Sequence, residues 1–311
     1  MFYSCDPEHR ETIEPEKPSI ENPEEPEGPE SPDEPEIPST NTIINLNNEF
    51  MIVGSNSWNS VAYGNGIFVV GGSEGYVTTS TDEGKTWSTP KQLVTIGSWS
   101  NVIYANGSFM MLNFHNGKLA TSTDGTIWTI GDTYSLSYWR GLAYGNGIYV
   151  AVGPSNGIMM TSPDGKTWTK RTVGSMTWKD IAYGNGIFIA IADGYFVTST
   201  DGITWTNQKR IPNISRGYDI ITFGNGKFVV AEGYRGNTQT TTDGVTWTTP
   251  NTSSGNHSWQ DIAAGNGKFI LVGNSGYIAT STDGITWAPT QIKDEAGSPV
   301  TLILYGVCAT Q

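Results

Sequence analysis

A short motif recurs six times along this chain and constrains its fold more than any other feature. Each copy contains a Ser or Thr, one variable residue and an Asp, then a Gly, and ends in a Trp four or five residues after the Asp. The motif aspartates are Asp82, Asp124, Asp164, Asp201, Asp243 and Asp283. Successive motif tryptophans lie 41, 40, 37, 42 and 40 residues apart. A period near 40 with strand-like content is typical of a β-propeller, in which each repeat folds into one small sheet.

Each repeat has the pattern of four short strands. In residues 178–205, runs rich in β-branched and aromatic residues alternate with the turn signals Asn185-Gly186, Asp193-Gly194 and Asp201-Gly202. Asn-Gly tolerates positive φ at both central positions, as a tight hairpin turn requires. Residues 204–206 (Thr-Trp-Thr) are expected to open the fourth strand. The sequence therefore predicts an all-β fold, a β-propeller whose blades are four-stranded antiparallel sheets.

The repeated Asp has a structural explanation. An Asp at the head of a hairpin turn can accept hydrogen bonds from backbone N–H groups two residues on, and the preceding Ser or Thr can do the same. The Gly supplies a permissive φ, and the Trp buries a large ring against the neighbouring sheet. We therefore assign all six aspartates a structural role rather than a catalytic or metal-binding one.

The number of blades follows from what the repeats leave over. Six full units begin near residues 58, 99, 139, 178, 217 and 259, and the pieces 42–57 and 299–311 remain. Within the second piece, residues 304–306 (Leu-Tyr-Gly) echo residues 182–184 (Ala-Tyr-Gly) of a first strand. A ring must close without open edges, and joining the two chain ends in one blade achieves this. We predict seven blades with a composite N- and C-terminal closing blade; six blades with extra edge strands is the alternative.

The negative charge of the chain is concentrated near its N-terminus. Residues 1–40 hold 13 of the 30 acidic residues, 2 of the 17 basic residues and 9 of the 16 prolines. This composition has too few apolar side chains to offset the entropy of ordering, so residues 1–41 are predicted to be a disordered tether. The remaining domain, 42–311, has 17 acidic and 15 basic residues. It offers no basic stripe to a phosphate backbone, which argues against nucleic acid as a partner.

Cys5 stands at the start of this tether. The run Phe2-Tyr3-Ser4-Cys5, followed at once by a polar segment, is similar to the end of a bacterial lipoprotein signal peptide. The resemblance implies a lipidated Cys5, and an incidental thiol is the alternative. No run of 18 apolar residues exists, so membrane contact is expected only through the lipid anchor. The expected location is extracytoplasmic, as an outer-membrane or cell-surface lipoprotein or otherwise as a secreted protein. Cys308 lies in an apolar run and is expected to be buried.

The two faces of such a propeller carry different kinds of loop. The turns joining strands one to two and three to four lie on one face, and they are the nearly identical Asn-Gly and Asp-Gly turns. The turns joining strands two to three and the loops between blades lie on the other face, and these differ from unit to unit. Loops that differ on a repeating scaffold are the expected recognition surface.

Candidate ligand-binding residues lie on this variable face. Five tryptophans begin first strands and could either stack on sugar rings or pack between blades; their regular repetition favours packing. The fifth unit breaks the pattern with Arg216-Gly217-Tyr218, close to Tyr234-Arg235. The candidates are Trp58, Trp99, Trp139, Trp178, Trp259, Tyr138, Arg140, His115, Lys179, Arg216, Tyr218, Tyr234 and Arg235.

The six motifs resemble the Asp-box (BNR) repeats of sialidases and of many non-enzymatic propellers, over residues 58–287. The unit with Trp-x-x-Ile-Ala-Tyr-Gly-Asn-Gly resembles the bacterial surface lipoprotein propellers of this sialidase-like superfamily most closely. A sialidase would need three converging arginines, a Tyr/Glu nucleophile pair and an acidic proton donor. The family's Arg-Ile-Pro motif precedes the first Asp box, whereas Arg210-Ile211-Pro212 follows the fourth here. Residues 42–311 contain only five arginines, and a converging trio is not expected.

No other chemistry is indicated by the motifs. The three histidines are scattered, and neither a metal-ligand cluster nor a phosphate-cradling loop is found, so no metal and no cofactor are expected. We expect a non-enzymatic, surface-displayed binding or adhesion propeller, acting as a monomer, that recognises a glycan or a cell-surface or extracellular protein. The alternatives are a sialidase-like glycoside hydrolase and a structural or assembly scaffold.

Overall fold

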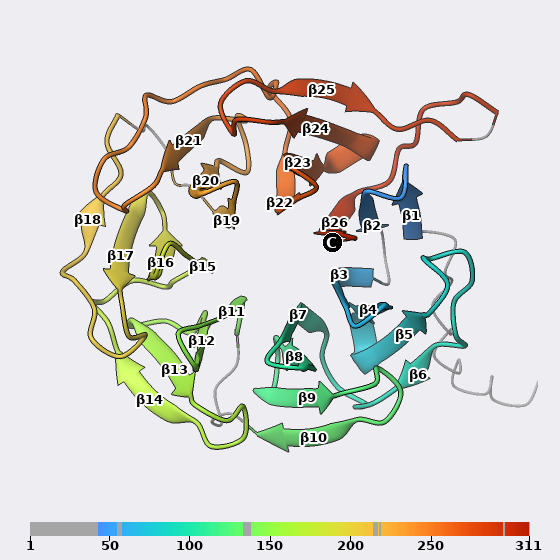
Figure 1. Ribbon diagram of the computed structural model, residues 1–311, viewed down its shortest axis with the longest axis horizontal. Helices are drawn as coiled ribbons and strands as arrows, with labels where there is room; N and C mark the ends of the chain where they lie inside the picture. Colours follow the sequence, from blue (N-terminus) through green and yellow to red (C-terminus); the bar gives the residue numbers. More distant parts are fainter. Residues whose placement is uncertain are drawn as a thin grey trace, which may run out of the picture. The chain divides into compact units, whose positions relative to one another are not determined.

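The computed structural model describes residues 43–54, 58–132, 138–213, 217, 219–294 and 296–310. The chain divides into two units between residues 36 and 37, and every described residue belongs to the second. The described residues form seven antiparallel sheets arranged in a ring (Figure 1). The prediction of seven blades is confirmed, and the six-bladed alternative is wrong. The predicted tether and Cys5 lie outside the described residues.

Six blades are consecutive segments of the chain, with the first strand of each innermost (Figure 1). Blade 1 consists of β3 (Trp58–Gly64), β4 (Ile67–Gly72), β5 (Tyr76–Ser80) and β6 (Lys91–Gln92). Blade 2 consists of β7 (Trp99–Ala105), β8 (Ser108–Asn113), β9 (Lys118–Ser122) and β10 (Thr129–Asp132). Blade 3 consists of β11 (Gly141–Gly145), β12 (Ile148–Val152), β13 (Ile158–Ser162) and β14 (Thr169–Thr172).

The second half of the ring continues this order. Blade 4 consists of β15 (Asp180–Gly184), β16 (Ile187–Ala192), β17 (Tyr195–Ser199) and β18 (Lys209–Arg210). Blade 5 consists of β19 (Ile220–Gly224), β20 (Lys227–Ala231) and β21 (Thr238–Thr241). Blade 6 consists of β22 (Trp259–Gly265), β23 (Lys268–Gly273), β24 (Tyr277–Ser281) and β25 (Ala288–Gln291). The short 3-10 turns η2 (Ser73–Gly75) and η3 (Asn274–Gly276) join second and third strands. Within the described ranges, no helix has the length and apolar character needed to cross a membrane.

The outermost strand of blade 4 is short because a side-chain hydroxyl replaces a backbone carbonyl as hydrogen-bond acceptor next to the third strand. In blade 4, Thr206 N donates to Thr198 O at 2.9 Å, but Thr198 N donates to the Thr206 hydroxyl instead of to a carbonyl. The fourth strand then begins only at Lys209, so the prediction that residues 204–206 open it is wrong by five residues. Blade 5 repeats the pattern, with Thr248 at the fourth-strand position and no regular strand.

Blade 7 closes the ring with both ends of the described chain. Its inner strand is β26 (Leu304–Ala309), and β2 (Phe50–Gly54) and β1 (Ile43–Leu46) follow outward. Asn47 and Asn48, with φ of 55° and 58°, form the tight turn between β1 and β2. Thr310 N donates to Glu49 O at 3.0 Å beyond the end of the ladder. The predicted composite closing blade is confirmed.

Blade 7 does not align with the other blades in the way that the similarity of residues 304–306 to residues 182–184 predicts. Leu304 pairs with Gly54 next to a β-bulge, as Trp58 does with its partner in blade 1. Leu304 is fully buried and takes the position that a Trp holds in other blades. The alignment of residues 304–306 with 182–184 is therefore wrong by four residues, because burial of an apolar side chain at the strand start, rather than the Tyr-Gly pair, sets the register.

The core lies in seven apolar clusters, one at each interface between neighbouring blades. At the interface of blades 3 and 4, Trp178 is fully buried beside Ile148 and Val150. The motif residue Trp205 packs against the same cluster and is partly buried. Each such ring buries a large apolar area and fixes the distance between two sheets. Cys308 is partly buried at the interface of blades 7 and 1, and burial raises the pKa of its thiol.

Five of the six Asp turns, all except that of Asp82, share one hydrogen-bond pattern. At Asp201, Oδ1 accepts from Ile203 N at 2.8 Å and from Thr204 N at 2.7 Å. These N–H groups, Thr204 first, lower the pKa of Asp201 to about 2. Gly202 has a φ of 70°, and a Cβ there would lie 2.9 Å from Ile148 Cγ2 of the preceding blade. The contacts support a structural role for the motif.

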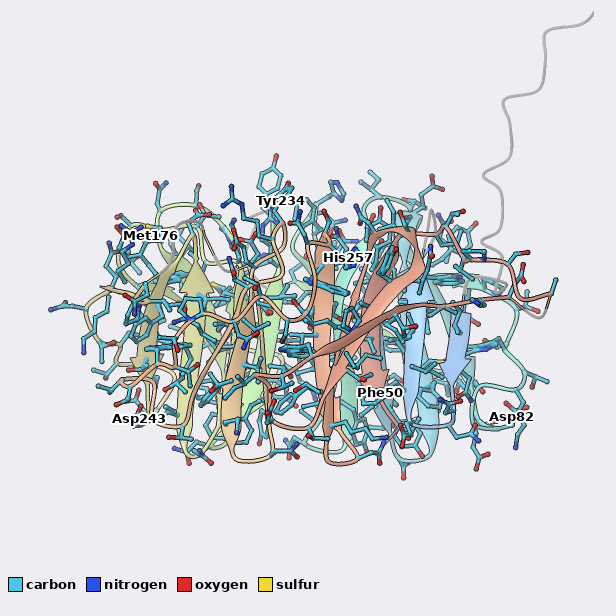
Figure 2. The ribbon with its side chains drawn as sticks, turned by 90° about the horizontal axis from the view of Figure 1, so that it is seen from above. Phe50, Asp82, Met176, Tyr234, Asp243 and His257 are labelled. Atoms are coloured by element: carbon cyan, nitrogen blue, oxygen red, sulfur yellow. The ribbon has the colours of Figure 1, made fainter. Side chains whose placement is uncertain are left out.

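The two faces of the ring are arranged as the sequence predicts. Figure 2 shows Asp82 and Asp243 of the Asp turns at one face, which we call the turn face. Met176, Tyr234 and His257 lie at the opposite face, which we call the variable face (Figure 2). On the turn face, Asn185 Nδ2 of blade 4 donates to Gly226 O at 2.9 Å in blade 5, so hairpin turns link neighbouring blades.

Candidate functional site

A cavity of about 730 Å³ opens on the variable face, where the seven inner strands begin. Every blade contributes at least one side chain to its lining, and Tyr234 marks its rim (Figure 2). Concave sites at which several chain segments converge are the usual location of ligand binding. The cavity is therefore the natural candidate for a binding site.

One backbone position lines this cavity in every blade. In five blades it is the residue directly after the Trp at the start of the first strand, which we call the blade Trp. In the two blades without this Trp, it is the residue after position 218 and the residue after Leu304. The seven residues at this position, the mouth ring, are Asn59, Ser100, Arg140, Lys179, Asp219, Gln260 and Tyr305. The ring thus presents seven different residue types from one repeated position. Its three charged members lie on consecutive blades, 3 to 5.

The two cations of the mouth ring differ in their partners. Lys179 Nζ lies 2.5 Å from Asp219 Oδ1 and 2.7 Å from Asp193 Oδ1. Burial alone would lower the pKa of Lys179, but the hydrogen bonds to these two carboxylates raise it. Arg140 has no carboxylate oxygen within 4.0 Å among the described residues. Lys179 is therefore neutralised within the protein, whereas Arg140 faces the cavity with no described carboxylate to compensate its charge.

Two carboxylates lie one residue beyond the mouth ring and join neighbouring blades. Asp180 accepts from Ile181 N at 2.8 Å and from Ile221 N of blade 5 at 2.9 Å. Asp261 accepts from the next residue and from Val307 N of blade 7 in the same way. Both side chains reach the cavity and are partly buried, and this burial raises the pKa of each to about 7. Both aspartates thus clamp blades together and titrate near neutral pH.

An aromatic group lies beside Arg140. The Phe114 ring meets His115 and Tyr138 edge-on, at centroid distances of 5.0 and 5.4 Å, and Arg140 Cζ lies 5.4 Å from its centroid. Tyr138 is 57% exposed and has a φ of 74°, a rare conformation for a bulky residue. Its N–H donates to the Phe114 carbonyl, which holds it there. The fold thus brings together three predicted residues, His115, Tyr138 and Arg140.

The remaining predicted residues are divided between cavity and surroundings. Tyr234 is 71% exposed and lines the cavity from blade 5. Arg235 beside it is exposed but does not line the cavity. Arg216 and Tyr218, where the repeat breaks, lie outside the described residues.

The five tryptophans that begin first strands are buried, and of the five only Trp259 is among the described residues that line the cavity. Trp58, Trp99, Trp139 and Trp178 are 0% exposed, and Trp259 is 2% exposed. Each belongs to an apolar cluster between two blades. The stacking-platform interpretation therefore fails for these residues, because each side chain is buried in a cluster between two sheets, and the packing interpretation accounts for them.

Several cavity residues escaped the sequence analysis. Asp219, Gln260 and Tyr305 of the mouth ring, and Asp180 and Asp261 behind it, were not among the candidates. Aligning the residue that follows each first-strand Trp would have found Gln260, and also Asn59 and Ser100, but it would have missed Asp219 and Tyr305 because the fifth unit and the closing blade lack that Trp. Among the described residues, no three His, Cys, Asp or Glu side chains are grouped as a metal site.

Comparison with known proteins places the chain among β-propellers. Residues 45–172 match a family model described as the DUF6242 beta propeller domain. No curated protein matches the sequence. Virginiamycin B lyase from Staphylococcus aureus is similar in structure, with a TM-score of 0.68 at 13% identity over 80% of this chain and 90% of that chain. YCF48 bound to D1 peptide has a TM-score of 0.61 at 18% identity, over 87% and 96%.

A structure of streptogramin B lyase is similar to the same degree, with a TM-score of 0.69 at 11% identity over 84% of this chain and 91% of that chain. At these identities the similarity shows a shared propeller fold and carries no information on activity. The fold thus supports a binding or scaffold role, and the site itself has to supply anything more specific.

Proposed function

We propose that this protein is a non-enzymatic binding module that recognises its ligand at the mouth of the propeller on the variable face. One observation carries the proposal: a single repeated position holds seven different residue types around a cavity of about 730 Å³. Positions that serve folding alone repeat in this chain, as the Asp turns do. A position at which every blade differs is therefore assigned to recognition rather than to packing.

A glycan fits this mouth better than an apolar ligand. The lining is rich in amide and hydroxyl side chains, such as Asn59, Ser100 and Gln260, which match sugar hydroxyls as donors and acceptors. Tyr234 and the Phe114 group add exposed aromatic faces at the rim. A partner protein is the second ligand class, and the structure of YCF48 bound to D1 peptide is an example of a similar fold that holds a peptide.

A glycoside hydrolase is the enzymatic alternative, and the carboxylates in the mouth favour it. Asp180 and Asp261, each with a pKa raised by burial to about 7, have the protonation behaviour of general acids. Against this role, each uses both oxygens to accept backbone N–H groups, and Asp219 is engaged by Lys179. The carboxylates are thus committed to the scaffold, and we rank binding first. A purely structural or assembly role is the third possibility.

The location and ancestry proposed for the protein rest on its sequence. The acidic, Pro-rich residues 1–41 and Cys5 support display outside the cytoplasm on a lipid-anchored tether. The six Asp turns, with their shared spacing, support a relationship to Asp-box propellers. Labelling with a lipid analogue, lost in a Cys5→Ser variant, tests the anchor directly.

Binding of the full chain to a broad glycan array, with each bound spot analysed for cleavage, tests the function. We expect retention of a defined sugar set, uncleaved, and weakened by Tyr234→Ala on the variable face. Ile127→Ala is the matched control, because Ile127 is an equally exposed apolar residue in an Asp turn. Cleaved spots would establish the hydrolase instead, and binding unaffected by Tyr234→Ala would remove the mouth as the site.

A further inference from the structure

The charge in the mouth is divided unequally around its circumference. The acidic side chains Asp180, Asp219 and Asp261 belong to blades 4, 5 and 6. Lys179 lies among them and is paired with two carboxylates. Arg140 on blade 3 is the cation of the mouth ring that no described carboxylate neutralises, and residues 133–137, which precede it in the sequence, include no acidic residue. Among the described residues that line the mouth, Arg140 is therefore the favourable place for an anion to bind.

The position of Arg140 is fixed by the scaffold. Its backbone N–H donates to Val152 O at 2.9 Å, and Ser100 Oγ of blade 2 donates to the preceding carbonyl, that of Trp139, at 2.9 Å. The Phe114 ring supports the guanidinium at 5.4 Å. A guanidinium held against an aromatic ring keeps its N–H edges free, and these edges match the two oxygens of a carboxylate.

The surroundings of Arg140 restrict what else the ligand can carry. Asn101 and Ser100 of blade 2 and Asn59 of blade 1 line the neighbouring arc with neutral hydrogen-bonding groups. The acidic arc on the other side disfavours a second anionic group, because like charges repel. The mouth is thus suited to a ligand with one carboxylate and several hydroxyl groups, and unsuited to a polyanion.

We propose that Arg140, supported by Phe114, forms a carboxylate subsite and that the ligand is a sugar acid, a saccharide with a single carboxylate near its end. The inference rests on the proposed binding function and specifies its substrate class. It differs from the carboxylate site of sialidases, which needs three arginines, because Arg140 is the only arginine among the described residues that line the cavity.

The test is calorimetric titration of the full chain with a disaccharide that ends in glucuronic acid and with its methyl ester. A short peptide with a free C-terminal carboxylate, and its amide, form the second pair of probes. The variants are Arg140→Gln, Arg140→Lys and the control Arg171→Gln, whose side chain lies on β14 of the same blade and donates to the Thr161 hydroxyl outside the cavity. Thermal unfolding of each variant checks that it folds.

We expect the sugar acid to bind roughly 10- to 100-fold more tightly than its ester, as for hydrogen bonds to a charged group. Arg140→Gln should remove this preference, Arg140→Lys should retain part of it, and Arg171→Gln should leave it unchanged. Equal binding of acid and ester, or a preference that survives Arg140→Gln, would overturn the subsite. The comparison of acid with ester uses the unmodified protein, so it still tests the preference for a free carboxylate if Arg140→Gln unfolds.

Two further outcomes separate this inference from the proposed function. Tighter binding of the peptide acid than of the sugar acid would overturn the sugar assignment. If neither acid binds while neutral glycans are retained in a Tyr234-dependent manner, the carboxylate subsite is refuted and the mouth remains the binding site. If no glycan depends on Tyr234 either, the proposed function fails as well.

Discussion

On the turn face, the N–H two residues after the motif Asp donates to that carboxylate at 2.8 Å in five different blades. On the variable face, the same seven blades place seven different residue types around the mouth. Both faces belong to the same strands, so the difference does not come from the scaffold. It indicates that this chain keeps its sequence uniform where side chains satisfy the backbone, and varies it around the mouth, where we propose that a ligand binds.

Trp178→Ala should have the largest effect on stability. Trp178 lies towards the variable face of its blade, yet its side chain serves folding. We expect a loss of ~3–5 kcal/mol in the free energy of unfolding, as for other buried aromatic truncations. Denaturant titration measures it. The exposed Tyr234→Ala variant, expected within about 0.5 kcal/mol of the parent, is the control. A loss below 1 kcal/mol for Trp178→Ala would contradict its role between the blades.

The carboxylates behind the mouth ring should make stability depend on pH in an unusual direction. The folded pKa of Asp180 and Asp261, about 7, exceeds the unfolded value of 3.8. The folded protein then binds more protons than the unfolded chain between these values, so stability falls as pH rises from about 4 to 7. Asp180→Asn gives up one acceptor of a backbone N–H but removes this pH dependence, so its melting temperature relative to the parent should be several degrees higher at pH 8 than at pH 5.

The control for this pH effect is Asp132→Asn, because Asp132 is exposed and pairs only with Lys118 at the surface. Equal changes at the two pH values for Asp180→Asn would refute the buried-acid explanation. The turn face behaves in the opposite way. Asp201 has a folded pKa of about 2, so its contribution is complete above about pH 4 and is lost as pH falls towards 2.

Asp201→Ala should lower stability less, because the carboxylate is solvent-exposed and the Asp201 turn is one of six that stabilise the ring. It removes the acceptor of two backbone hydrogen bonds. We expect the melting temperature at pH 7 to fall by roughly 2–4 °C, with little change in ligand binding. Calorimetry at pH 7 and pH 2 measures it. An unchanged melting temperature at pH 7 would show that the motif does not stabilise its turn.

Tyr234→Ala should have the smallest effect on stability. It tests the opposite case to Trp178→Ala, a residue of the variable face that we assign to binding rather than to packing. The ring is mostly exposed and lines the cavity. We expect a melting temperature within about 1 °C of the parent together with weakened ligand binding. A variant that loses several degrees would instead place Tyr234 among the packing residues.

The repeat made the fold predictable, and its interruptions limited the prediction of the site. The Asn-Gly and Asp-Gly turns fixed strand order, face assignment and the closing blade, because turn geometry is local. The mouth ring could be found only by placing one residue per blade in register. That register fails in sequence where Tyr218 replaces Trp and where Leu304 does. Ion pairs such as that of Lys179 with Asp219 join residues that are 40 positions apart on neighbouring blades, so no local sequence pattern predicts them.

The composite closing blade has a consequence for how the chain is made. Phe50 pairs with Ala309, so the first strands of the ring find their partner only when the last strand has been synthesised. A chain delivered N-terminus first, by a ribosome or an export channel, must carry β1 and β2 as an open edge throughout its emergence. Completion of the ring is then a late event between distant segments, and the time before it is when the protein is most exposed to aggregation and proteolysis.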